Sequence, residues 1–188
     1  MDIFSHAFWT AVAAKSANFK IKHFKKRRPI SAIWSAVWGI APDIFAFAPI
    51  FVSSAIIILF GSDGVTVFDI PRPSEVEPTD GNGLFIFKLT RALYNIGHSA
   101  VIFGVVFVLA YFIFKRVRWE MLGWFLHIII DIPTHSYKFY PTPAFWPLAE
   151  WKFDGVAWGT PWFMALNISA IGLVSLFYFL HTHRKNKP

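Results

Sequence analysis

Long runs of apolar residues are the feature that most restricts how this chain can fold. Residues 29–61 contain one charged residue, Asp43, and residues 92–114 and 161–180 contain no Asp, Glu, Lys or Arg. A shorter apolar run, residues 121–132, includes Asp131. An apolar run of about 20 residues can cross the hydrocarbon core of a bilayer as a helix. The sequence therefore predicts an all-α, polytopic transmembrane bundle of about four or five membrane-embedded helices, forming a single integral membrane domain over residues 1–188.

The second of these membrane segments is expected to be broken. Gly39 and Pro42 lie close to Asp43 in the stretch G-I-A-P-D-I. Proline removes a backbone donor and its ring clashes with the preceding turn, which kinks or ends a helix. A break at membrane depth is tolerated where the backbone lines a cavity or is buried in protein. We therefore expect a broken second segment next to Asp43.

The basic residues predict how the chain is oriented in the membrane. Thirteen of the 18 Lys and Arg fall within residues 15–28, 115–118 and 184–187, each bordering an apolar run. Basic loops stay on the cytoplasmic side and contact anionic lipids. We therefore expect these clusters at the inner face of a bacterial or archaeal cell (inner) membrane, and no nucleic-acid partner despite the net charge of +7. The aromatic residues of the loop 134–160 and its border are then expected in the outer headgroup belt, namely Tyr140, Phe145, Trp146, Trp151, Trp158 and Trp162.

The run H-I-I-I-D-I-P-T-H is the strongest local signal for function. His127, Asp131 and His135 are spaced four residues apart, so a helix would stack them along one face, about 6 Å apart per step. Imidazoles and a carboxylate in this arrangement are typical metal ligands. Pro133 ends the helix and places His135 on the turn that follows. Because the chain has no cysteine, any metal must be bound by His, Asp, Glu and water.

Three further ionisable residues lie in the other apolar segments. Counting about 1.5 Å per residue from the basic clusters, His6, Asp43 and His98 fall in the middle or outer half of the membrane, as the run does. Taken alone, His98 fits a hydrogen-bonded core histidine and His6 an interfacial residue. No Lys or Arg lies at a comparable depth, so protonation or a metal must offset the charge of Asp43 and Asp131. The pattern favours a shared metal site with six candidate ligands: His6, Asp43, His98, His127, Asp131 and His135.

Four short motifs, taken in order, resemble a known family. S-H-A-F-W-T, G-I-A-P-D-I, G-H-S and H-I-I-I-D-I-P-T-H are similar to those of the membrane-bound metal-dependent hydrolases, also described as LexA-binding, inner-membrane-associated hydrolases. The resemblance extends from His6 to about Pro147. It implies metal-associated roles for five residues: His6, Asp43, His98, His127 and Asp131.

His135 departs from the family pattern. Relatives often follow the H-x3-D pair with Thr and Gly, whereas this chain has Thr134, His135 and Ser136. His135 is therefore either a further ligand or a substrate contact. The H-x3-D pair is also distantly similar to the zinc-dependent phospholipase C and P1 nuclease group, whose members use several zinc ions on phosphate esters.

These observations lead to a hypothesis about chemistry. Two or more divalent ions, with zinc favoured by the histidine content, would activate a water molecule, and Asp43 and Asp131 are the candidate catalytic residues. The predicted substrate is a lipid or lipid-linked phosphoester at the outer face, with membrane lipids as partners and Lys138 and Lys152 as candidate phosphate contacts. Three alternatives remain: a divalent-metal or proton transporter, a structural metal-binding membrane protein, and a partner of a cytoplasmic regulator.

Overall fold

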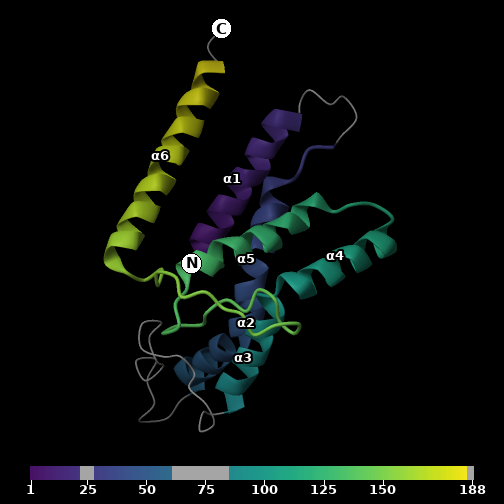
Figure 1. Ribbon diagram of the computed structural model, residues 1–188. Coiled ribbons are helices and arrows are strands. Elements are labelled where there is room, and N and C mark those ends of the chain that lie inside the picture. Colours follow the sequence, from purple (N-terminus) through teal and green to yellow (C-terminus); the bar gives the residue numbers. More distant parts are fainter. Residues whose placement is uncertain (22–27, 61–84, 186–188) are drawn as a thin grey trace.

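The computed structural model describes residues 1–21, 28–60 and 85–185. Within these ranges every named element is a helix, and the only β pairing is an isolated bridge between Ser136 and Phe139, so the all-α prediction is confirmed (Figure 1). The elements are α1 (Ile3–Ile21), α2 (Ala32–Phe60), α3 (Phe85–Gly97), α4 (Ala100–Phe114), the short 3-10 helix η2 (Trp119–Met121), α5 (Leu122–Thr134) and α6 (Pro161–Lys185).

Two described helices, α2 and α6, are long and apolar enough to cross a membrane. The consecutive helices α3 and α4 form a third candidate span if the bent pair is counted as one. By contrast, the 13 residues of α5 rise about 20 Å, which is less than the about 30 Å of a bilayer core. Two or three spans are therefore identified by length and composition, fewer than the four or five membrane-embedded helices expected from the sequence.

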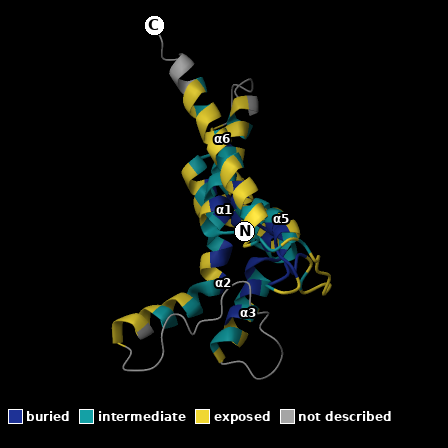
Figure 2. Ribbon diagram, turned by 90° about the vertical axis from the view of Figure 1, so that its left-hand side faces the viewer, coloured by how far each residue is buried: buried dark blue, intermediate teal, exposed yellow. Residues whose placement is uncertain are grey.

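The distribution of side chains is that of a protein in an apolar solvent. Large apolar side chains such as Phe4, Ile113 and Leu173 are exposed, whereas His6 and Asp131 are completely buried. Figure 2 shows exposed residues along the outer faces of α6 and α2 and buried residues where α1, α2 and α5 meet. Hydrocarbon chains can cover the apolar surface, while the polar groups must find partners inside the bundle.

The break lies in a different segment from the expected one. The prediction of a broken second segment is wrong, because α2 is a single helix with Pro42 and Pro49 inside it, although it changes direction along its length (Figure 2). The interrupted segment is the next one, where α3 and α4 meet at an angle of 62°. His98 and Ser99 occupy this break, and Ser99 begins α4 by accepting a hydrogen bond from the backbone of Ile102 at 3.1 Å.

Helix α2 is the central element and contacts α1, α3 and α5. Two glycines allow this close packing. A Cβ atom on Gly39 would overlap the side chain of Thr10 on α1, and one on Gly123 of α5 would overlap the backbone oxygen of Ser35 on α2. Small residues at helix crossings let backbones approach each other within a membrane. This packing brings ligand-bearing faces of three helices together.

Gly123→Ala is therefore expected to destabilise the protein by about 1–3 kcal/mol, because the added methyl group must push the backbone of α2 away from α5. The matched control is Gly104→Ala on α4, where a Cβ meets nothing within 4 Å. Thermal unfolding in detergent measures the difference. Equal unfolding temperatures for the two variants would show that the α2–α5 contact is not close.

The segment after α5 folds back over the end of that helix. Its backbone amides donate to α5 and its end, with Gly155 bonding to His135 at 2.8 Å and Val156 to Pro133 at 2.9 Å. Of the aromatic residues expected in the headgroup belt, Tyr140 is buried against protein side chains, whereas Trp151 and Trp162 are exposed. Residues 22–27, 61–84 and 186–188 are outside the described residues, and with them four of the seven basic residues of the first cluster and one of the three of the last.

Candidate metal centre

The six candidate ligands come together in one buried cluster. They come from four parts of the fold: His6 from α1, Asp43 from α2, His98 from the α3–α4 break, and the H-I-I-I-D-I-P-T-H run from α5 and its end. All six are at most 5% exposed. This exposure is far lower than expected for solvated charged groups, so each group must be satisfied within the protein or by a bound cation.

Four of these residues form a set with metal-binding geometry. One donor atom from each of Asp43, His98, His127 and Asp131 lies within 4.8 Å of all the others. His127 Nε2 is 3.0 Å from His98 Nε2 and 3.0 Å from Asp131 Oδ2, and His98 Nε2 is 3.4 Å from both carboxylates. A tetrahedral ion with bonds of about 2.0–2.1 Å places its ligands about 3.3 Å apart. The observed separations therefore suit one small divalent ion.

A hydrogen bond from Nδ1 to a backbone oxygen fixes the ring orientation of His127 and of His98. His127 Nδ1 donates to the backbone oxygen of Gly39 at 2.7 Å, and His98 Nδ1 donates to that of Tyr94 at 3.1 Å. With Nδ1 protonated, a neutral imidazole presents the lone pair of Nε2. Two such lone pairs 3.0 Å apart repel each other unless a cation or a shared proton lies between them. Backbone acceptors behind ligating histidines are the usual arrangement in metal sites.

The other oxygen of Asp131 faces a second group of donors. Asp131 Oδ1 lies 2.9 Å from His6 Nε2 and 3.5 Å from His135 Nε2. The amino group of Met1 lies 2.6 Å from the same oxygen and 3.0 Å from His135 Nε2. The ring of His6 stacks on that of His127 at 3.8 Å, so the two donor groups are adjacent. Asp131 therefore connects them.

Several buried polar atoms in this cluster have no hydrogen-bond partner. These are both ring nitrogens of His6 and Asp131 Oδ2. Buried polar atoms are almost always paired, and leaving one unpaired costs about 1–3 kcal/mol. Two of these atoms face other candidate ligands, with His6 Nε2 at 2.9 Å from Asp131 Oδ1 and Asp131 Oδ2 at 3.0 Å from His127 Nε2, so a cation nearby would satisfy them. The residues present thus fit a divalent metal, and a set of imidazoles and carboxylates suits zinc, iron or manganese.

Tyr94 and Tyr140 support the centre and were not anticipated from the sequence. His135 Nδ1 donates to the backbone oxygen of Tyr140 at 2.8 Å, and the Tyr94 hydroxyl donates to the same oxygen at 2.7 Å. The ring of Tyr94 also stacks on that of His98 at 3.7 Å. Tyr94 precedes His98 by four residues, a spacing from which a shared helix face could have been inferred.

His135 is held as a neutral imidazole facing the centre. Burial lowers the pKa of His135 to about 3. Tyr140 presents its oxygen to His135 from a left-handed backbone conformation, with φ at 44°, which is uncommon for a residue with a side chain. The segment is therefore shaped around His135, whose Nε2 lies 3.5 Å from Asp131 Oδ1.

Tyr94→Phe is expected to weaken metal affinity about 10- to 100-fold, because supporting hydrogen bonds around ligands contribute that much. Tyr137→Phe is the control, since its exposed hydroxyl bonds to Lys152 outside the cluster. Titration of the metal-free proteins with zinc under competition from a chelator measures the effect. Equal affinities for the two variants would contradict a supporting role for Tyr94.

A cavity lies beside His135, on the side of the segment that follows α5. It has a volume of about 280 Å³ and is lined by His135, Ser136, Lys138 and the residues that lead into α6. Lys138 is exposed at its edge, whereas Lys152 does not line it. Of the two lysines considered as phosphate contacts, Lys138 has the closer placement.

The comparisons with known proteins neither support nor contradict the family resemblance. No family model, no curated protein and no solved structure matches this chain.

Proposed function

We propose that this protein is a membrane-embedded, metal-dependent hydrolase that acts on phosphoesters. The observation that carries the proposal is the set of Asp43, His98, His127 and Asp131, whose donor atoms converge inside a bundle of apolar helices. Buried ionisable groups at membrane depth are costly and are typically functional. The proposal agrees with the resemblance to the membrane-bound metal-dependent hydrolases.

The topology in this proposal follows the basic clusters. The loops that contain them lie in the cytoplasm, and α1 and α5 enter the membrane beside the spanning helices, giving the four or five embedded helices expected from the sequence. The segment after α5 then lies at the outer face of a bacterial or archaeal cell membrane. This orientation gives the cavity beside His135 access to the outer leaflet.

Two ions are proposed for the centre, with zinc favoured by the histidines. The first would be held by Asp43, His98, His127 and Asp131. The second would be held by Asp131, His6 and His135, and it would displace the Met1 amino group, which lies 2.6 Å from Asp131 Oδ1 and 3.0 Å from His135 Nε2. Asp131 would contribute to both sites, because its two oxygens face the two donor groups. Bridged pairs of ions are common in enzymes that cleave phosphate esters.

The residues have distinct roles in the proposed hydrolysis. When bound, the ions supply a Lewis acid and lower the pKa of a water molecule. Asp43 would accept a proton from the attacking water as the water oxygen forms a bond to phosphorus. The ester P–O bond would break, and the departing alkoxide would take that proton from Asp43 and leave as an alcohol. Lys138 contacts the phosphate from the cavity beside His135.

A structural metal site is the second candidate function. The first donor set has four protein ligands and is almost completely buried, and structural zinc sites are usually closed in this way. It predicts bound metal without turnover.

The deciding experiment measures metal and hydrolysis on the same detergent-purified protein. Phosphomonoesters and phosphodiesters with a chromogenic leaving group are tested before chelation, after chelation and after zinc is restored. We expect hydrolysis that chelation abolishes and zinc restores, because the proposed reaction requires a Lewis acid at the buried donors. Stoichiometric metal with no hydrolysis of any ester would assign the centre to the structural role.

A further inference from the structure

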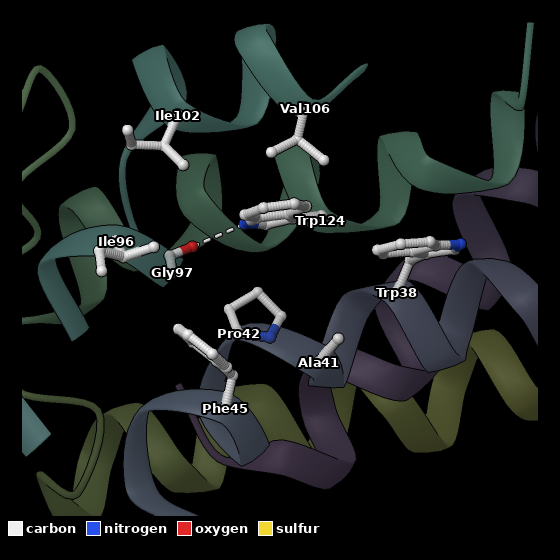
Figure 3. A pocket seen from close by; sticks show the side chains of 9 residues that line it. All are labelled: Trp38, Ala41, Pro42, Phe45, Ile96, Gly97, Ile102, Val106 and Trp124. Atoms are coloured by element: carbon white, nitrogen blue, oxygen red, sulfur yellow. Dashed lines mark hydrogen bonds between the residues drawn. The ribbon is translucent and has the colours of Figure 1, made fainter. Parts of the chain in front are cut away.

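An apolar cavity lies directly beside the candidate metal centre. The cavity has a volume of about 240 Å³ and is formed by α2, α3, α4 and α5. Two of its wall residues directly precede predicted ligands, Pro42 before Asp43 and Gly97 before His98. Figure 3 shows Pro42 and Phe45 on one side of the space, with Ile102 and Val106 on the opposite side.

The walls of this cavity offer no free hydrogen-bonding side chain. Two of the wall residues carry an indole nitrogen. That of Trp124 donates to the backbone oxygen of Gly97 at 2.6 Å, and that of Trp38 points away from the space (Figure 3). The remaining wall side chains are apolar. Water is retained only where it finds several polar partners, so apolar cavities stay dry or bind apolar ligands. A hydrocarbon is therefore the occupant that this lining suits.

The cavity is continuous with the lipid-facing surface of the bundle. Phe45 lines it and is itself 46% exposed, and the adjacent residue Ile44 is also exposed. On α4, Val106 lines the cavity while its neighbour Val105 is 54% exposed. In a bilayer, acyl chains contact these outward side chains, so a chain can enter the cavity without passing through water.

We infer that this cavity binds one hydrocarbon chain of a lipid phosphoester whose phosphate lies at the metal centre. The inference rests on the proposed function, which places cations beside Asp43 and His98. The cations complement the charge of a phosphate, and the neighbouring cavity complements an alkyl or prenyl chain. An amphiphile with both parts matches the pair of sites, whereas a soluble phosphoester would leave the cavity unfilled.

Two adjacent residues on α4 provide a matched test. Val106→Phe fills the cavity, and Val105→Phe adds the same side chain on the lipid-facing surface. Ile102→Phe is a second cavity-filling variant from the same wall. The substrates are alkyl p-nitrophenyl phosphates from methyl to octyl, used below their micelle concentrations. The measured quantity is the ratio of kcat/KM for the octyl and methyl esters.

For the unchanged protein we expect kcat/KM to rise about fourfold per methylene until the cavity is full, the factor that corresponds to about 0.8 kcal/mol per buried methylene. Val106→Phe is expected to lower the octyl-to-methyl ratio of kcat/KM at least about tenfold. This factor corresponds to losing the contribution of about two methylene groups, whose space the added ring takes. Val105→Phe is expected to preserve the ratio. Equal ratios in the unchanged protein and all three variants would overturn the inference.

A binding measurement separates this inference from the proposed function. A dodecyl phosphate with a diazirine at the chain end is crosslinked to the full-length protein in detergent, and the labelled residues are identified by mass spectrometry. We expect labels on cavity-wall residues such as Ile96 and Ile102, competed by dodecyl phosphate and lost in Val106→Phe. Such labelling without hydrolysis would reject the proposed enzyme and retain the chain site. Hydrolysis with labels only on lipid-facing residues would reject the chain site and retain the proposed enzyme.

Discussion

Purified Asp131→Asn protein is expected to retain at most about a tenth of the divalent metal that the unchanged protein binds. Even removal of a group behind a ligand costs about 10- to 100-fold in affinity, and Asp131 itself contacts both donor groups. Asparagine has nearly the same shape but no charge, and its amide nitrogen cannot replace the second carboxylate oxygen. Metal per protein, measured by elemental analysis after gel filtration, reports the loss.

Glu150→Gln is the control for this measurement, because it neutralises an exposed carboxylate in the segment after α5. It should leave the metal content unchanged. Asp131→Asn protein that remains folded and keeps its full metal content would show that Asp131 does not bridge the centre. A zinc titration then distinguishes the loss of one ion from the loss of two.

Asp43→Asn is expected to lower kcat for phosphoester hydrolysis by about 10²- to 10⁴-fold, the usual contribution of a general base. Asp43 is the most exposed of the six candidate ligands, at 5%, and its oxygen is farther from His127, at 3.7 Å, than that of Asp131 is. Asparagine keeps an oxygen that can bind an ion but cannot accept a proton. Turnover should therefore fall much further than metal content.

The two quantities must be measured on the same preparation, together with a pH profile of kcat. In the unchanged protein, the rate should fall at acidic pH as the base becomes protonated, and Asp43→Asn should abolish that dependence. Undiminished turnover would remove Asp43 from the proton transfer. Metal loss as complete as in Asp131→Asn would make Asp43 a ligand alone.

The position of the helix break illustrates the limit of local sequence signals. Pro42 was expected to break its segment, but α2 continues through it and the break occurs at His98 and Ser99. Proline inside a membrane helix is tolerated when neighbouring groups satisfy the freed carbonyl. The actual break is fixed by long-range contacts, since Ser99 donates to the backbone of Trp146 and Ala100 to that of Ala144. No local pattern around His98 reveals those partners.

The same limit applies to the ligand set. The four-residue spacing of His127, Asp131 and His135 predicted a shared face, and the three do lie together. Spacing did not reveal that the two oxygens of Asp131 face different donor groups.

The sequence by itself determined the helical class, the apolar runs and the six ionisable residues within them. It could do so because hydrophobicity and residue type are local properties of the chain, and burying a charge in an apolar segment is costly wherever it occurs. Only the tertiary structure decided how those residues are combined. Close packing of α1, α2 and α5 through Gly39 and Gly123 divides the donors between the two oxygens of Asp131 and leaves an apolar cavity beside Asp43 and His98. These outcomes depend on contacts between distant segments, which spacing along one helix does not encode.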